Sequence, residues 1–205
     1  MKFQECCEEG KLKRAMEGVL LDFDGTLTKP AFDWPAMKEE MGLADGEVSI
    51  LDHLPTLSPD RAREISDILE KHELMAADKA EASDGAHELL AYLRRRSIPF
   101  GVVTNNAERH VLKMVKKINV SFEVLITRDM GCWKPDPRPM FAGAEAIGVS
   151  PGRCVVIGDG KYDMMAAKAA GMLSVHLAEC SSVPSDLTLR TLREAPALLD
   201  QLLDK

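Results

Sequence analysis

Two aspartates stand one residue apart at the end of an apolar run. Asp22 and Asp24 follow Val19 to Leu21, and Gly25 comes directly after them. Side chains two positions apart on a strand lie on the same face, about 7 Å from one another, so both carboxylates can point into one site. Such a pair can supply a nucleophile and a group that transfers a proton. Taken alone, Asp-Gly is also a common turn signal, which is the simpler interpretation.

Polar residues with complementary chemistry follow other apolar runs. Thr104 and Asn105 come after one such run, Asp159 comes after another, and Lys134 lies in the loop after a third. A hydroxyl, an amide or backbone N–H, and an ammonium group are together the donors that bind a phosphoryl group. The sequence therefore indicates a phosphoryl site assembled from distant parts of the chain. Residues 104–106 could also cap the helix that follows them.

Three carboxylates in one site, those of Asp22, Asp24 and Asp159, would repel one another strongly unless a cation neutralised them. A small number of hard oxygen ligands, with coordination positions left open, suits Mg²⁺ better than zinc or iron. Mg²⁺ held in this way usually shares its ligand shell with water and a phosphate. We therefore expect Mg²⁺ to be the cofactor of the site.

These residues need a scaffold that brings the ends of several strands together. From residue 83 onward, helical and strand-like segments alternate, with Ser83 as the expected cap of the first helix. Short, continuously apolar strands separated by helices are typical of a parallel sheet covered on both faces, and ligands bind outside its carboxyl strand ends. The predicted fold is therefore α/β, a Rossmann-like doubly wound parallel sheet. The expected strands are 18–23, 98–103, 122–126, 154–157 and 172–176, and the expected helices are 83–96, 107–118, 137–147 and 162–170.

One interval is too long for this alternation. Thr104 comes 80 residues after Asp24, whereas a βαβ unit has a pitch of roughly 30 residues. The excess is too long for a plain loop, and its apolar spacing is helical, with a helix of about 20 residues expected to begin at Ser58. We therefore predict a small α-helical cap inserted after the first strand. The predicted boundaries are 15–29 and 83–205 for the core and 30–82 for the cap.

Composition and charge exclude several classes of protein. The 205 residues are 45% hydrophobic and 29% charged, and no apolar run approaches the roughly 18 residues that cross a bilayer. The net charge of −7 argues against a general nucleic-acid binder, because that affinity comes mainly from Lys and Arg. The five cysteines, Cys6 and Cys7 among them, lack metal-ligand spacing, which predicts free thiols in a reducing cytoplasm. We expect a cytoplasmic protein that binds neither nucleic acid nor membrane.

Four segments together resemble the motifs of the haloacid dehalogenase superfamily, in order and in spacing. They are DFDGTLT at 22–28, VVTNN at 102–106, WKPDP at 133–137 and VVIGDGKYD at 155–163. The inserted segment also falls where a helical cap sits in phosphoglycolate-phosphatase-like and β-phosphoglucomutase-like members. The resemblance implies hydrolysis of a small phosphorylated metabolite, phosphoglycolate-like or sugar-phosphate-like, through an aspartyl-phosphate, rather than cleavage of a carbon–halogen bond.

The resemblance also implies roles for individual residues. Asp22 would be the nucleophile, and Asp24 would be the general acid and base, with its backbone carbonyl also binding Mg²⁺. Thr104 and Lys134 would hold the transferred phosphoryl oxygens, and Gly25 would form, with Thr26, the turn that lets backbone amides approach the phosphate. The implied phosphate-binding residues are Asp24, Gly25, Thr104, Asn105 and Lys134. The implied metal-binding residues are Asp22, Asp24, Asp159 and Asp163.

Two alternative functions remain open. A phosphomutase of the β-phosphoglucomutase type would share the core and differ in what the cap does to the phospho-enzyme. A phospho-acceptor signalling module also uses carboxylates, Mg²⁺, Thr and Lys, but it normally spreads its acidic residues over different strands and lacks an inserted cap. The expected protein is a monomer or a small homo-oligomer.

Overall fold

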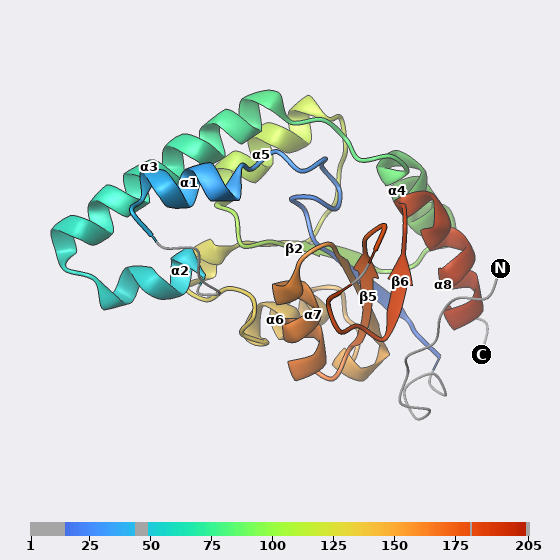
Figure 1. Cartoon of the computed structure of the whole chain (residues 1–205). Coiled ribbons are helices and arrows are strands. Elements are labelled where there is room, and N and C mark those ends of the chain that lie inside the picture. Colours follow the sequence, from blue (N-terminus) through green and yellow to red (C-terminus); the bar gives the residue numbers. More distant parts are fainter. Residues whose placement is uncertain (1–14, 44–48, 181, 204–205) are drawn as a thin grey trace.

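The computed structural model describes residues 15–43, 49–180 and 182–203. Within them, six parallel strands form one sheet in the order β3-β2-β1-β4-β5-β6 (Figure 1). This order, with β1 in the middle and the chain winding outward in both directions, is the predicted doubly wound α/β architecture. The strands are β1 (Gly18–Leu21), β2 (Phe100–Val103), β3 (Leu125–Ile126), β4 (Cys154–Gly158), β5 (Leu173–Leu177) and β6 (Leu187–Leu189).

Successive side chains of β1 divide the core into two layers. Val19 and Leu21 belong to one apolar cluster with side chains of α4, α5 and α8, whereas Leu20 belongs to a second cluster with side chains of α6 and α7. Because alternate residues of a strand point to opposite faces, helices cover both faces of the sheet. These helices are α4 (Ala86–Arg95), α5 (Glu108–Lys117), α6 (Arg138–Ala146), α7 (Lys161–Ala169) and α8 (Ala195–Leu203).

The strand register determines where the site lies. Strand β1 ends beside β2 and β4, because Leu21 pairs with Val102 on one side and with Ile157 on the other. The polar residues that follow these strands therefore meet at a single edge of the sheet, at its carboxyl end.

Two details of the predicted elements need correction. The sheet has a sixth strand, β6, beyond the five that were expected, and a final helix, α8, follows it. Helix α4 begins at Ala86 rather than after Ser83, and its N-cap is Gly85, which has a φ of 92°. A positive φ of this size is readily adopted by Gly and rarely by other residues, so the glycine determines where this helix begins.

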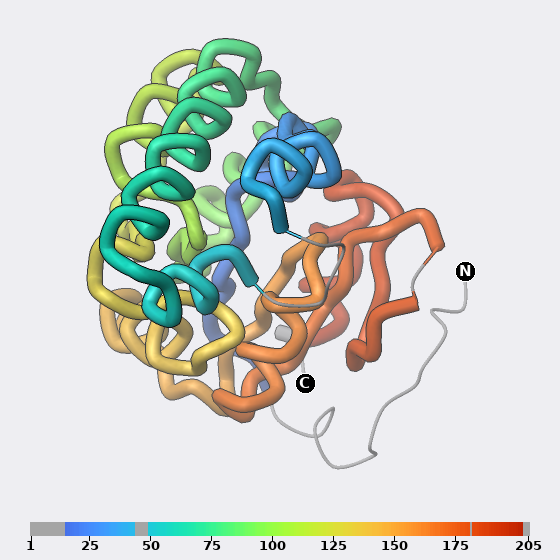
Figure 2. The backbone as a smooth tube through the Cα atoms, turned by 60° about the vertical axis from the view of Figure 1, so that its left-hand side comes forward, coloured from blue at the N-terminus to red at the C-terminus, as the bar shows by residue number. Residues whose placement is uncertain are grey.

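The residues between β1 and α4 form the predicted helical insertion. It contains α1 (Trp34–Glu40), α2 (Ile50–His53) and α3 (Pro59–Lys79). Buried side chains of these helices, from Met37 to Leu69, form an apolar cluster of their own. Helix α3 also lies along α5 of the core, as the two views together show (Figure 2). We propose that this insertion is a cap with the boundaries expected from the sequence.

Two further predictions concern composition. Cys132, Cys154 and Cys180 are free thiols, as expected, while Cys6 and Cys7 lie outside the described residues. Among the described helices, none is both long enough and apolar enough to cross a membrane.

Candidate active site

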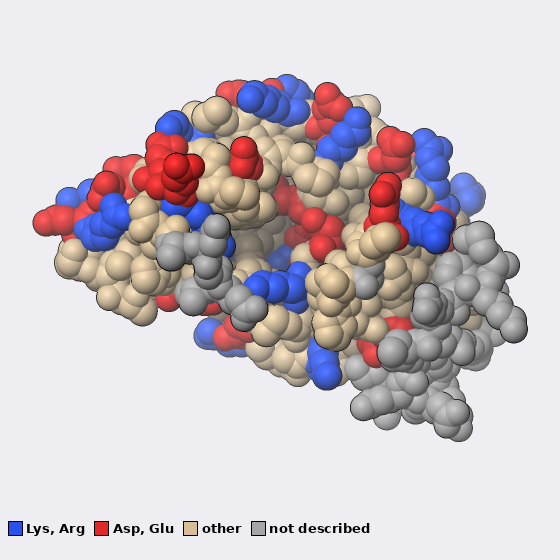
Figure 3. Space-filling model, viewed as in Figure 1, with Lys and Arg blue, Asp and Glu red and all other residues tan. Residues whose placement is uncertain are grey.

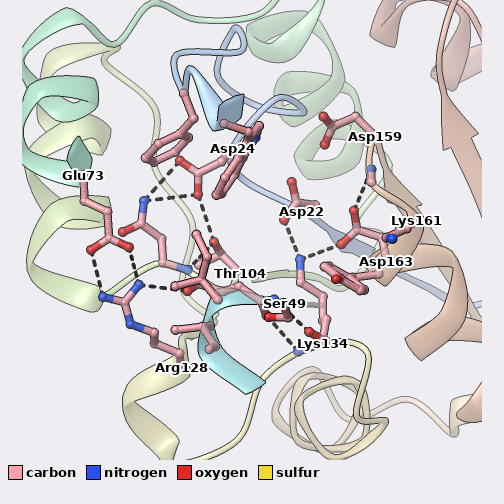
Figure 4. A pocket seen from close by; sticks show the side chains of 18 of the residues that line it. Asp22, Asp24, Ser49, Glu73, Thr104, Arg128, Lys134, Asp159, Lys161 and Asp163 are labelled. Atoms are coloured by element: carbon pink, nitrogen blue, oxygen red, sulfur yellow. Dashed lines mark hydrogen bonds and ion pairs between the residues drawn. The ribbon is translucent and has the colours of Figure 1, made fainter. Parts of the chain in front are cut away.

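A buried lysine holds two carboxylates at the centre of the site. Lys134 Nζ donates to Oδ1 of Asp22 at 2.5 Å and to Oδ1 of Asp163 at 2.6 Å (Figure 4). It also donates to the carbonyl of Val103, at the end of β2, at 2.8 Å. Burial alone would lower the pKa of Lys134, but the carboxylates of Asp163 and Asp22 outweigh burial and raise it. The lysine therefore stays charged at physiological pH.

The side chain of Asn105 fixes the backbone of Lys134. Its amide nitrogen donates to the Lys134 carbonyl at 2.8 Å, and its Oδ1 accepts from the Lys134 backbone N–H at 2.7 Å. These bonds tie the end of β2 to the loop that carries the lysine. The Asn105 side chain thus positions Lys134. The predicted contact of Asn105 with a phosphoryl group stays a prediction, and the backbone N–H of Asn105 is the group that would make it.

Asp24 has different partners from those of Asp22. Its carboxylate accepts from Oγ1 of Thr104 at 3.1 Å and from Nδ2 of Asn106 at 3.1 and 3.2 Å. Burial raises the pKa of Asp24 to about 6, although the hydrogen bonds from Asn106 and Thr104 act against this rise. A carboxyl group with such a pKa can both give and take a proton near neutral pH.

Asn106 is a site residue that the sequence reasoning did not identify. Residues 104–106 were also open to interpretation as a helix cap, and Oδ1 of Asn106 does accept from the backbone N–H of Ala107, the N-cap residue of α5, at 2.8 Å. The first N–H of α5 itself, that of Glu108, donates to the Asp129 carboxylate at 2.9 Å. The amide nitrogen of the Asn106 side chain is the part that binds Asp24. The second asparagine of VVTNN was the available signal.

Asp159 lies against the turn that follows β1. Oγ1 of Thr26 donates to its Oδ1 at 3.2 Å. Gly25 has a φ of 86°, and a Cβ atom at this position would clash with the Asp159 carboxylate. Only glycine combines that backbone conformation with the space required. The predicted turn thus also positions a third carboxylate.

Asp22, Asp159 and Asp163 form a group that fits a cation, which we call the strand-end cluster. One carboxylate oxygen of each lies within 4.8 Å of the others. Burial, and secondarily the nearby Asp163, raises the pKa of Asp22 well above its usual value and also raises the pKa of Asp159. The three carboxylates carry more negative charge than the single ammonium group of Lys134 can balance. Carboxylate oxygens are also the ligands that hard divalent cations prefer. The Asp24 side chain lies outside this cluster, so its predicted metal contact is left to its backbone carbonyl.

A cavity of about 440 Å³ opens above these residues. Asp22, Asp24 and Lys134 line it from the core, and Trp34 and Ile50 line it from the cap helices. The space-filling view shows it as a hollow with acidic side chains inside (Figure 3). Its volume lies within the roughly 300–1,000 Å³ typical of small-molecule sites.

A second set of titratable side chains lies where the cap meets the core, and we call this set the seam cluster. Glu70 and Glu73 of α3 and His110 of α5 each bring one ligand atom within 4.8 Å of the others. Here the carboxylates have guanidinium partners, because Arg109 pairs with Glu70 and Arg128 pairs with Glu73. Burial lowers the pKa of His110, whose side chain is almost fully enclosed.

Comparisons with known proteins agree with one another. A sequence model of haloacid dehalogenase-like hydrolases matches residues 35–171. A phosphoglycolate phosphatase of Xanthomonas campestris is 31% identical over 185 residues, which are 79% of this chain and 83% of that protein. A haloacid dehalogenase-like hydrolase domain-containing protein of Arabidopsis thaliana is 27% identical over 193 residues, 88% of this chain and 79% of that one. The crystal structure of a hydrolase from Pseudomonas syringae matches with a TM-score of 0.78 and 21% identity, over 91% of this chain and 99% of that one, and shows the same fold.

Proposed function

The chain belongs to the haloacid dehalogenase-like hydrolases, and we propose that it is a Mg²⁺-dependent phosphatase acting on a small phosphorylated metabolite through an aspartyl-phosphate. One observation carries the proposal. Two carboxylates separated by one residue in the sequence face one cavity with separate partners, Lys134 for Asp22 and Thr104 for Asp24. The cytoplasmic location and the monomeric or small homo-oligomeric state expected from the sequence are part of the same proposal.

Asp22 is the proposed nucleophile. Lys134 binds its Oδ1, which orients the carboxylate so that Oδ2 can attack the phosphorus. A phosphorus–oxygen bond forms to Asp22, the ester phosphorus–oxygen bond breaks, and its electron pair passes to the leaving oxygen. Lys134 and the Thr104 hydroxyl would bind the transferred phosphoryl oxygens, with the backbone amides of Gly25 and Asn105 beside them.

Asp24 is the proposed acid and base. In its protonated form it would give a proton to the leaving oxygen, and its raised pKa of about 6 supports this form in a buried site. As a carboxylate it would then take a proton from a water molecule whose oxygen attacks the phosphorus. That attack breaks the bond to Asp22 and releases inorganic phosphate.

The strand-end cluster is the proposed Mg²⁺ site. Asp22, Asp159 and Asp163 would hold the ion, together with the Asp24 carbonyl that the family resemblance implies. Mg²⁺ bound there would offset the negative charge of the phosphoryl group. The surplus of carboxylates over Lys134 supports this assignment.

Hydrolysis of p-nitrophenyl phosphate by the full chain tests the nucleophile. We expect Mg²⁺-dependent activity that falls by about 10³-fold or more in Asp22→Asn, because that variant removes the attacking oxygen. Asp136→Asn is the matched control, since Asp136 lies close to Lys134 in sequence but bonds to Arg138 at the surface. Full activity of Asp22→Asn would contradict the proposal.

Product analysis with a metabolite panel separates the alternatives. A phosphatase releases inorganic phosphate, whereas a phosphomutase returns an isomerised sugar phosphate. A signalling module would instead accumulate phosphorylated Asp22 and release phosphate slowly.

A further inference from the structure

A buried ion pair joins the cap to one wall of the cavity. Glu73 of α3 accepts from both terminal nitrogens of Arg128, one of the bonds measuring 2.8 Å. Arg128 lies two residues after the end of β3 and also donates to the carbonyl of Asn105 at 3.0 Å. Both side chains line the cavity, and Figure 4 shows them across it from Asp159 and Asp163.

Stability does not explain why this pair is buried. The other buried positions of α3 are apolar, namely Ile65, Leu69, Ala76 and Ala77. An apolar residue at position 73 would continue this face without removing charges from water. Replacing a buried ion pair by well-packed apolar residues is often neutral or stabilising. The position of the pair on a cavity wall therefore points to a ligand.

The pair keeps hydrogen-bonding capacity after its members have bound each other. A guanidinium has five N–H donors, and the bonds from Arg128 to Glu73 and Asn105 account for only part of them. Each carboxylate oxygen of Glu73 accepts one hydrogen bond from Arg128 and has a second lone pair, and Nε2 of His110 lies 3.7 Å from Oε2, beyond hydrogen-bonding distance. A ligand hydroxyl group both donates and accepts, so it can bind to both members at once.

The charges around the pair disfavour a second anionic group on the ligand. Glu73 already neutralises Arg128, and the two lysines that line the cavity besides Lys134, Lys38 and Lys161, come from other elements. A ligand carboxylate at the ion pair would therefore meet the Glu73 carboxylate and a guanidinium whose charge is already balanced. A hydroxyl group brings no charge to this end of the cavity and costs less free energy to bury.

Apolar side chains of the cap line another part of the cavity. They include Ile50, Leu51 and Leu69, together with Trp34, which is 51% exposed and stacks on Phe32 with ring centroids 5.0 Å apart. These surfaces suit the carbon skeleton of a ligand whose hydroxyl groups face the ion pair. A two-carbon leaving group would fill little of a cavity of about 440 Å³.

We propose that Glu73 and Arg128 form a binding subsite for hydroxyl groups of the leaving group. The preferred substrate is then a polyhydroxylated phosphate ester, of the polyol or sugar type, rather than a short carboxylated one. This inference rests on the proposed phosphatase function and adds its substrate class. On this inference the Glu73–Arg128 ion pair, which joins the cap to the core, also selects the substrate.

Steady-state kinetics with three phosphate esters test the subsite. For the unmodified chain, kcat/KM should be at least tenfold higher with sorbitol 6-phosphate than with 2-phosphoglycolate. In Arg128→Gln, kcat/KM for sorbitol 6-phosphate relative to that for p-nitrophenyl phosphate should fall at least tenfold. The variant removes the guanidinium that binds the ligand hydroxyl groups, and p-nitrophenyl phosphate has no such groups in its leaving group. The double variant Glu73→Leu with Arg128→Met should show the same fall, and it avoids leaving a lone buried charge.

Asp78→Asn is the matched control, because Asp78 lies on α3 like Glu73 and also pairs with a cation of the core, Lys113 of α5. It should leave the substrate ratio unchanged. An equal loss of activity on all esters in Arg128→Gln would overturn the subsite and assign Arg128 to positioning Lys134 through Asn105. An unchanged ratio would overturn it as well.

A binding measurement separates this inference from the proposed function. If the unmodified chain hydrolyses no phosphate ester, the proposed function fails, and calorimetric titration with sorbitol 6-phosphate decides the subsite. Binding that weakens at least tenfold in Arg128→Gln supports the subsite. No binding, or equal binding by both proteins, overturns it.

Discussion

The strand-end cluster and the seam cluster each bring three titratable side chains together but differ in charge balance. In each, three side chains bring ligand atoms within 4.8 Å of one another. The strand-end cluster has three carboxylates and one lysine, which pairs with Asp22 and Asp163, whereas in the seam cluster each carboxylate has an arginine of its own. A divalent cation would neutralise the first and would compete with guanidinium groups in the second. Charge balance, more than proximity, therefore distinguishes a metal site from an ion-pair network.

The largest expected effect comes from removing the lysine of the strand-end cluster. Lys134→Met leaves Asp22 and Asp163 buried without their cation, and breaking a buried pair costs roughly 3–5 kcal/mol. Urea unfolding in the presence of a chelator should show this loss, and Mg²⁺ should restore part of it. Arg109→Met is the seam counterpart, and its exposed pair should cost less than about 1 kcal/mol. Equal losses in the two variants would show that the clusters do not differ.

Two members of the strand-end cluster could be predicted because their positions follow from the sheet, whereas Asp163, in the first turn of α7, was predicted only from the family resemblance. Asp22 and Asp159 each come directly after a short apolar strand, and parallel strands bring their carboxyl ends to one edge. Lys134 lies in a loop, but its place within a recognised motif indicated its role. Local sequence and one rule of topology were enough for Asp22 and Asp159, and the recognised motifs supplied Lys134.

The seam cluster could not be predicted in the same way. Glu70 and Glu73 are ordinary residues of a helix, and their partners Arg109, His110 and Arg128 come from two other elements. Their meeting depends on how α3 packs against α5, which no local pattern specifies. The strand β6 was missed for a related reason, since three residues at a sheet edge carry too little periodicity to be recognised.

Mg²⁺ should stabilise the protein through the strand-end cluster alone. At a concentration one hundred times the Kd, binding to the folded state adds about 2.7 kcal/mol, which appears as a higher Tm in calorimetry. Asp159→Asn should abolish most of this increase, because it removes one of the three carboxylates. Glu70→Gln, which changes the seam cluster, should retain it. A Tm increase that survives in Asp159→Asn but not in Glu70→Gln would reverse the assignment.

Asp24 in the cavity and His110 in the seam cluster should change stability with pH in opposite directions, so the net effect of the two groups should be small. Burial raises the pKa of Asp24 from 3.8 to about 6, so the folded state binds its proton more tightly, and this contribution to stability is lost as pH rises from about 4 to 6. Burial lowers the pKa of His110 below 6.5, so its contribution is lost as pH falls below that value.

Two variants separate these opposing contributions. In the presence of a chelator, Asp24→Asn should make the free energy of unfolding fall less steeply, or rise, between pH 4 and 6. His110→Gln should reduce the loss of stability that accompanies acidification below pH 6.5. Chemical unfolding at a series of pH values measures both slopes. Identical pH profiles in the two variants would contradict the assignment of opposite signs.

The smallest expected effect is that of Glu70→Gln on stability. The side chains of Glu70 and Arg109 are 42% and 60% exposed, so water and salt already screen their attraction, and the free energy of unfolding should change by less than about 0.5 kcal/mol. Urea unfolding at low and at high salt measures the change. A loss above about 1 kcal/mol, abolished by high salt, would mean that this exposed pair holds the cap on the core. The exposed Glu70–Arg109 pair would then contribute more to stability than its exposure suggests. The buried pair of the seam cluster is instead the one formed by Glu73, three residues along the same helix.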